Sequence, residues 1–172
     1  MTDGPFAEGA EIAGGYYVFE AENLDDALEL ARGIPAARYG AIEVRPILHA
    51  MDDAWSRHDA GWLALLLETP ETANTPGTPE WEAEAARHGD FAVAAGDHIA
   101  AGGALHEAAT ATTVRVRNGE VLLTDGPFAE AAEIATGIYL LSAADRDEAV
   151  KLASMIPASA VELRQLAGVS GL

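Results

Sequence analysis

One short motif occurs twice in this chain. It reads Thr-Asp-Gly-Pro-Phe-Ala-Glu at residues 2–8 and again at residues 124–130. At the same offset, roughly 20 of about 35 positions from residue 2 onward are identical. Because a match of this length is far above chance, the chain contains two copies of one structural unit, and its fold must accommodate both.

The motif combines residues that turn a chain sharply. An Asp side chain readily accepts hydrogen bonds from backbone N–H groups one to three residues further on. Gly avoids the clash that Pro imposes on its predecessor, and Pro suits the first turn of a helix. The motif therefore predicts a strand end, a tight corner and a short helical turn. Asp125 is then either a cap for this corner or a residue at the mouth of a pocket, because corners at strand ends often carry binding groups.

Each corner precedes a strand–helix–strand pattern. In the first copy the residues are β-rich at 15–21, helical with Asn23 as N-cap at 23–31, and alternating as in a half-buried strand at 41–47. In the second copy the corresponding segments are residues 137–143, 145–155 and 160–166.

Residues 48–60 are predicted to connect the two copies, with a possible short helix at 51–58. Within this connector His49 and Asp53 have a spacing that can hold a metal, but a solvated linker face is the favoured interpretation. Residues 61–68 form an apolar run of the length of a buried strand.

A loop at 69–78 is followed by an amphipathic helix that is predicted to begin at Thr78 and Pro79 and to end near Gly102-Gly103. The polar residues on it are predicted to be solvated: His88, Asp90, Asp97 and His98. Asn118-Gly119 between alternating segments at 112–123 predicts a β-hairpin.

These elements predict an α+β fold. Residues 61–167 contain two strand–helix–strand halves and an inserted hairpin, which is typical of a ferredoxin-like sandwich on an antiparallel sheet. Residues 1–47 supply only the second strand–helix–strand half of such a domain, here called a closing half. A half-repeat therefore precedes a complete domain. Residues 168–172 form a frayed tail.

One opening half, residues 61–123, is therefore shared between two closing halves. Chain continuity favours the second copy, which places strand 62–68 between 137–143 and 160–166; a circular permutant with the first copy is the alternative. Since Met1 aligns with Leu123 in the middle of a strand, we also expect that the natural protein begins earlier, with two complete tandem domains.

Composition excludes several classes of function. The chain has 10 Lys and Arg against 28 Asp and Glu, a formal net charge of −18, so a nucleic-acid-binding face or an anionic membrane surface is disfavoured. It has no cysteine for disulfides, thiolate metal sites or nucleophiles. A secretory signal and a membrane-spanning run are not found, so a cytoplasmic protein is predicted. Without a phosphate-binding loop, nucleophile elbow or HExxH motif, no cofactor or metal is predicted.

The motif, the apolar strand and the hairpin together resemble a known family, the YCII-related or DGPF-domain proteins. The resemblance is carried by Trp62–Glu68, by the stretch from Ala109 to Val121, and by Thr124–Glu130. Residues 61–166 are similar to one whole family domain, and residues 1–47 to the second half of another.

The resemblance implies a ferredoxin-like domain whose sheets pair in a dimeric α+β barrel, as a homodimer or as an intrachain pseudo-dimer. It implies a cleft beside the sheet for a small molecule, and some members accompany extracytoplasmic-function sigma factors. It also implies a catalytic Asp/His pair, which in this chain corresponds to Asp125 and His106.

Further residues are candidates for ligand binding. Arg115 and Arg117 share a face of the hairpin and suit an anionic ligand, unless they pair with acidic neighbours. Tyr17 and Tyr139 present hydroxyls to a cleft or serve as core aromatics. The motif adds two candidates, Asp3 and Phe128.

Three hypotheses of function follow. The first is a small-molecule-binding or regulatory module. The second is a hydrolase- or isomerase-like enzyme in which Asp125 and His106 transfer protons. The third is an interaction partner of a sigma factor. The sequence alone does not decide whether the protein is an enzyme.

Overall fold

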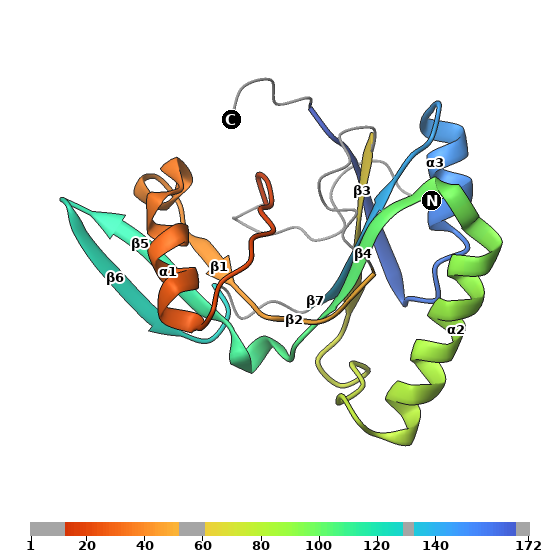
Figure 1. Ribbon diagram of the computed structural model, residues 1–172, viewed down its shortest axis with the longest axis horizontal. Helices are drawn as coiled ribbons and strands as arrows, with labels where there is room; N and C mark the ends of the chain where they lie inside the picture. The colour runs from red at the N-terminus through yellow and green to blue at the C-terminus, as the bar shows by residue number, and fades with distance from the viewer. Residues whose placement is uncertain (1–12, 52–60, 129–132, 168–172) are drawn as a thin grey trace. The chain divides into compact units, whose positions relative to one another are not determined.

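The computed structural model describes residues 13–51, 61–128 and 133–167 (Figure 1). These residues form two compact units that interleave along the chain. The ferredoxin-like unit contains the described residues of 47–105 and 133–167. The hairpin unit contains residues 13–46 and 106–128.

A five-stranded antiparallel sheet forms the ferredoxin-like unit. Its strands are β2 (Ile47–Met51), β3 (Trp62–Glu68), β4 (Ile99–Leu105), β7 (Ile134–Leu141) and β8 (Ala160–Gln165). Their spatial order is β2-β4-β7-β3-β8. Since β3 lies between β7 and β8, the opening half (residues 61–123) pairs with the strands of the second copy, as predicted. The four strands β4-β7-β3-β8 have the ferredoxin-like order, which confirms the predicted α+β fold class.

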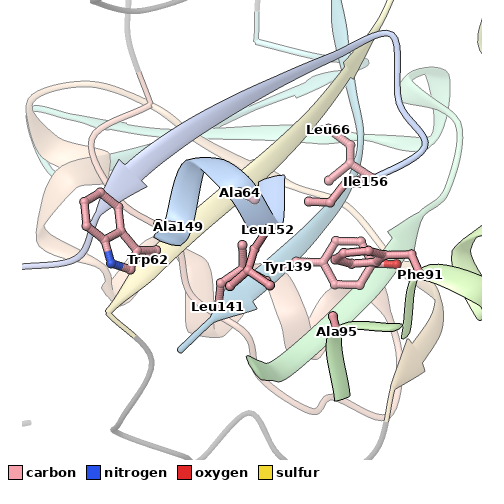
Figure 2. Close-up of a cluster of buried hydrophobic side chains, with 10 residues drawn as sticks. All are labelled: Trp62, Ala64, Leu66, Phe91, Ala95, Tyr139, Leu141, Ala149, Leu152 and Ile156. Carbon is pink, nitrogen blue, oxygen red and sulfur yellow. The ribbon is translucent and has the colours of Figure 1, made fainter. Parts of the chain in front are cut away.

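Two helices, α2 (Pro79–Ala95) and α3 (Arg146–Ala153), cover one face of this sheet (Figure 1). Successive strand residues face opposite sides, so Trp62, Ala64 and Leu66 of β3 all point toward the helices. Figure 2 shows the buried cluster that they form with Phe91, Ala95, Tyr139, Leu141, Ala149, Leu152 and Ile156. Removing this apolar surface from water is the main stabilising contribution to the unit.

Asn23 and Thr78 are N-caps as predicted, and the predicted helix start at Asp145 is the N-cap of α3. The side chains of Asn23, Thr78 and Asp145 each accept a hydrogen bond from the backbone N–H three residues further on. This bond satisfies one of the N–H groups that a helix start leaves without an intrahelical acceptor.

The end of α2 differs from the prediction. The helix ends at Ala95, and not near Gly102-Gly103, because Gly96 takes a positive φ of 54° that terminates the helix. Both predicted terminal glycines lie in β4, which pairs with β7. The sequence pattern missed β4 because Ala and Gly have low strand propensity. A close backbone approach favours small residues here: a Cβ on Gly137 would lie 3.1 Å from the Gly103 carbonyl oxygen.

The hairpin unit contains a three-stranded antiparallel sheet in the order β1-β5-β6. Its elements are α1 (Leu24–Gly33), the 3₁₀ helix η1 (Pro35–Arg38), β1 (Ile42–Val44), β5 (Thr112–Arg117) and β6 (Glu120–Asp125). Asn118 and Gly119 both have positive φ, so the predicted hairpin turn is confirmed. A small core of Ala31, Val44 and Val114 joins α1 to the sheet.

Two predictions for the first copy were wrong. Residues 15–21 form no strand. Their equivalent in the second copy is β7, which already occupies the position between β3 and β4. The strand predicted at 41–47 is interrupted at Arg45-Pro46, where Pro has no N–H to donate. Its two parts are β1, which joins the hairpin, and β2, which extends into the segment that was predicted to be a connector.

Candidate functional site

The second copy of the motif forms a corner at the end of β6. Gly126 has φ of 93°, and its N–H donates to the Ala111 carbonyl oxygen at 2.8 Å. Thr113 Oγ1 donates to the Gly126 carbonyl oxygen at 3.1 Å. The Phe128 N–H donates to Glu43 Oε2 at 3.0 Å. Among the described residues, the corner is therefore held by β1, by β5 and by Ala111 just before β5.

Asp125 does not cap this corner, so that interpretation was wrong. The N–H groups of Gly126 and Phe128 have other acceptors, and Pro127 has none to offer. Within the part of the chain that the structure describes, the exposed Asp125 carboxylate accepts no hydrogen bond. It is therefore accessible to a ligand or a substrate.

His106 belongs to the same unit as Asp125. The backbone N–H of His106 donates to the Pro46 carbonyl oxygen at 3.1 Å, and His106 is half-buried. Among the described residues no hydrogen bond or ion pair joins the His106 and Asp125 side chains. A proton-transfer pair would thus need a substrate or water between them.

Arg115 and Phe128 form the clearest contact between candidate residues. The guanidinium carbon of Arg115 lies 4.9 Å from the centroid of the Phe128 ring. Register places Leu122 opposite Arg115 and Thr112 opposite Asp125. Because strand residues alternate between faces, Arg115 and Asp125 point to opposite faces of the hairpin. The two candidate functions therefore use different surfaces.

Arg117 has a different role from Arg115. Its Nη1 donates to the Ala37 carbonyl oxygen at 2.9 Å, and its Nη2 donates to the Gly40 carbonyl oxygen at 2.8 Å. These bonds tie the hairpin to the end of η1. Cross-strand pairing with an acidic neighbour is not what holds this side chain, although Glu120 lies opposite it in register.

Tyr139 lies in the core of the ferredoxin-like unit. Its residue is 5 % exposed, its ring packs edge-on against Phe91, and burial raises its pKa to about 12. Tyr17, at the same position of the first copy, is 52 % exposed in the hairpin unit. Asp3, Asp53 and the helical turn predicted after each corner lie outside the described residues.

His88 was predicted to be solvated, and the structure corrects this. Its Nδ1 lies 3.0 Å from the Tyr139 hydroxyl, in the interface between α2 and the sheet. Burial lowers its pKa most; Arg87 lowers it further, while Glu84 and Glu68 act in the opposite direction. Its spacing of four residues from Ala92 and seven from Ala95 was the signal for the inner face of the helix.

Glu68 is a buried carboxylate that sequence reasoning missed. It is 7 % exposed, and it accepts hydrogen bonds from Thr72 Oγ1 at 3.1 Å and from the Ser159 N–H at 2.8 Å, as well as from the Ser159 hydroxyl. Its position at the end of an apolar run, on the same face as Leu66, was the available signal. This network joins β3 to the start of β8.

The described ranges were also compared with the requirements of a metal site and of a membrane-spanning helix. In residues 13–51, 61–128 and 133–167, no three His, Asp or Glu side chains are grouped so that they could hold a metal ion. None of the helices in these ranges combines the length and the apolar character that crossing a membrane requires.

The sequence model of the YCII-related domain matches residues 1–51 and 63–166 of this chain. The chain belongs to the YCII-related domain family. The matched ranges include both copies of the motif and the described strands of both sheets, except for Trp62 at the start of β3. A comparison of this YCII-related chain with curated proteins gave no match.

Proposed function

We propose that this chain is a small-molecule-binding or regulatory module of the YCII-related family, and that Arg115 with Phe128 binds an anionic group of the ligand. One contact supports this site: the guanidinium of Arg115 lies over the Phe128 ring, 4.9 Å from its centroid. Stacking occupies one face of the guanidinium and leaves its N–H edge for a carboxylate or phosphate.

The charge of Arg115 is also available to a ligand. Arg32, Arg45 and Arg164 pair with glutamates of their own segments, whereas Arg117 donates to backbone carbonyls. Within the described residues, Arg115 has no carboxylate within 4.0 Å and donates no hydrogen bond. In a chain with a net charge of −18, an arginine without a carboxylate partner favours an anion.

An NMR titration of the full chain with sodium acetate and with inorganic phosphate tests the site. Arg115→Gln is expected to weaken anion binding by about tenfold or more, because a charge-assisted hydrogen bond is lost. Arg32→Gln removes the same charge from an exposed position on α1 and is expected to leave binding unchanged. Equal weakening in both variants would show that net charge alone attracts the anion, and this result would contradict the proposal.

A proton-transfer enzyme is the second candidate, and the uncapped Asp125 carboxylate favours it. If Asp125 acts on a substrate, Asp125→Asn abolishes turnover while the melting temperature stays close to that of the wild type. A lower melting temperature without any effect on turnover would instead assign Asp125 a structural role.

We also propose that the chain self-associates, that a sigma factor is a partner, and that the protein is cytoplasmic. Self-association is tested by the molar mass of the full chain in solution, where a monomer at all concentrations would contradict it. A pull-down that retains no sigma factor would count against the third hypothesis. Fractionation of cells would test a cytoplasmic location.

A further inference from the structure

Leu122 lies directly opposite Arg115 in the β5–β6 pair. The side chains of directly opposed residues share a face, with Cβ atoms about 4.5–5.5 Å apart. Leu122 is 45 % exposed. The face next to Arg115 therefore presents an apolar and accessible side chain.

We infer that the ligand of this site is a monocarboxylate with an apolar body, such as an aryl or alkyl carboxylate. This inference rests on the proposed function, because it takes Arg115 as the group that binds the negative charge. The ligand carboxylate accepts hydrogen bonds from Arg115, and the apolar body covers Leu122. Burying that surface adds affinity that a small hydrophilic anion does not gain.

Two other polar groups on this face, Glu43 and Thr113, already have partners. Glu43 lies opposite Thr113 in register, so it shares the face of Arg115, and its Oε2 accepts the Phe128 N–H. Its other carboxylate oxygen pairs with Arg45, so the charge of Glu43 is already balanced. Thr113 is 1 % exposed, and its hydroxyl already donates to the Gly126 carbonyl oxygen.

The chain provides a matched control for Leu122. Leu123 is the next residue, it is 53 % exposed, and it lies opposite Val114 on the other face of the hairpin. Replacing either leucine by Thr keeps a residue of high strand propensity on β6. The two variants therefore differ mainly in the face from which apolar surface is removed.

The experiment titrates the full chain with sodium benzoate, sodium acetate and inorganic phosphate, followed by the amide signals of Leu122 and Phe128 in NMR spectra. Benzoate is expected to bind about tenfold more tightly than acetate, because its ring covers apolar surface. Leu122→Thr is expected to weaken benzoate binding roughly threefold or more while acetate binding is unchanged. Leu123→Thr is expected to change neither.

The outcomes separate this inference from the proposed function. If acetate and benzoate bind equally and both depend on Arg115, the anion site stands and the apolar monocarboxylate is overturned. If phosphate binds most tightly, or if Leu123→Thr has the larger effect, the inference is also overturned. If no anion binds, or Arg115→Gln has no effect, the proposed function itself fails together with the inference.

Discussion

The hydroxyl of Tyr139 on β7 and Nδ1 of His88 on α2 lie 3.0 Å apart, so one hydrogen bond links the sheet to its longest covering helix. The Tyr139 ring also packs edge-on against Phe91, with ring centroids 5.2 Å apart. A polar pair thus lies within an otherwise apolar interface, where an unsatisfied group is costly. This relationship makes both residues sensitive reporters of the stability of the ferredoxin-like unit.

Stability is expected to fall on acidification because of His88. Burial lowers its pKa in the folded chain, so the unfolded chain binds the proton more readily. The contribution of His88 is therefore complete above the usual histidine pKa of about 6.5 and decreases as the pH falls through that value. Glu84 and Glu68 oppose the shift, and Arg87 enhances it.

The measurement is the urea midpoint of the wild type and of His88→Gln, well above and well below that pKa. The wild type is expected to lose more stability than the variant between the two conditions. Identical losses would show that other groups, such as the many carboxylates, determine the acid response.

Tyr139→Phe is expected to destabilise the chain by about 1 kcal/mol, because it leaves the buried side of His88 without its partner. Tyr17→Phe, at the equivalent position of the first copy, is expected to have almost no effect, since Tyr17 is half exposed. Urea unfolding of both variants at neutral pH measures the difference. Equal effects would contradict the different environments of the two copies.

Glu68→Gln is expected to cost roughly 2 kcal/mol, because the buried carboxylate accepts from the Ser159 N–H and from two hydroxyls. An amide supplies a weaker acceptor and two donors that have no place there. Glu29→Gln on the exposed surface of α1 serves as the control and is expected to stay within about 0.5 kcal/mol of the wild type. A shift in melting temperature for the control alone would disprove the role of Glu68.

Gly126→Ala is expected to destabilise the chain by about 1–2 kcal/mol, because φ of 93° is strained for a residue with a Cβ. Gly89→Ala, in the middle of α2 where an added Cβ meets no atom within 4 Å, is expected to stabilise by roughly 0.5–1 kcal/mol. A lower melting temperature for Gly126→Ala and a higher one for Gly89→Ala, each relative to the wild type, would support the corner geometry. A stabilising Gly126→Ala would refute it.

Much of the local structure could be predicted from short-range signals. Asn23, Thr78 and Asp145 marked helix starts, and Asn118-Gly119 marked the hairpin, because capping and turn geometry depend on only a few neighbouring residues. β4 was missed for the converse reason: its strand conformation comes from pairing with β7 and not from its Ala and Gly residues.

The candidate site was predictable in its residues but not in its arrangement. Arg115, Phe128 and Asp125 could all be named from the motif and the hairpin. Their division between two faces follows from the register of β5 and β6, and the supporting role of Glu43 follows from the pairing of β1 with β5. Neither register can be read from one strand alone.

By itself, the sequence determined that two similar halves exist, where the corner of the second copy turns and where the helices begin. Chain continuity also predicted that the second copy occupies the sheet. Only the tertiary structure decided where the strands of the first copy go: β1 joins the hairpin, and β2 joins the edge of the five-stranded sheet. Tyr17 and Tyr139 stand at equivalent positions, yet only Tyr139 is buried, because β3 and β4 can pair with one copy of the strand at a time. Backbone preferences act over a few residues, whereas burial depends on partners that are distant in the chain.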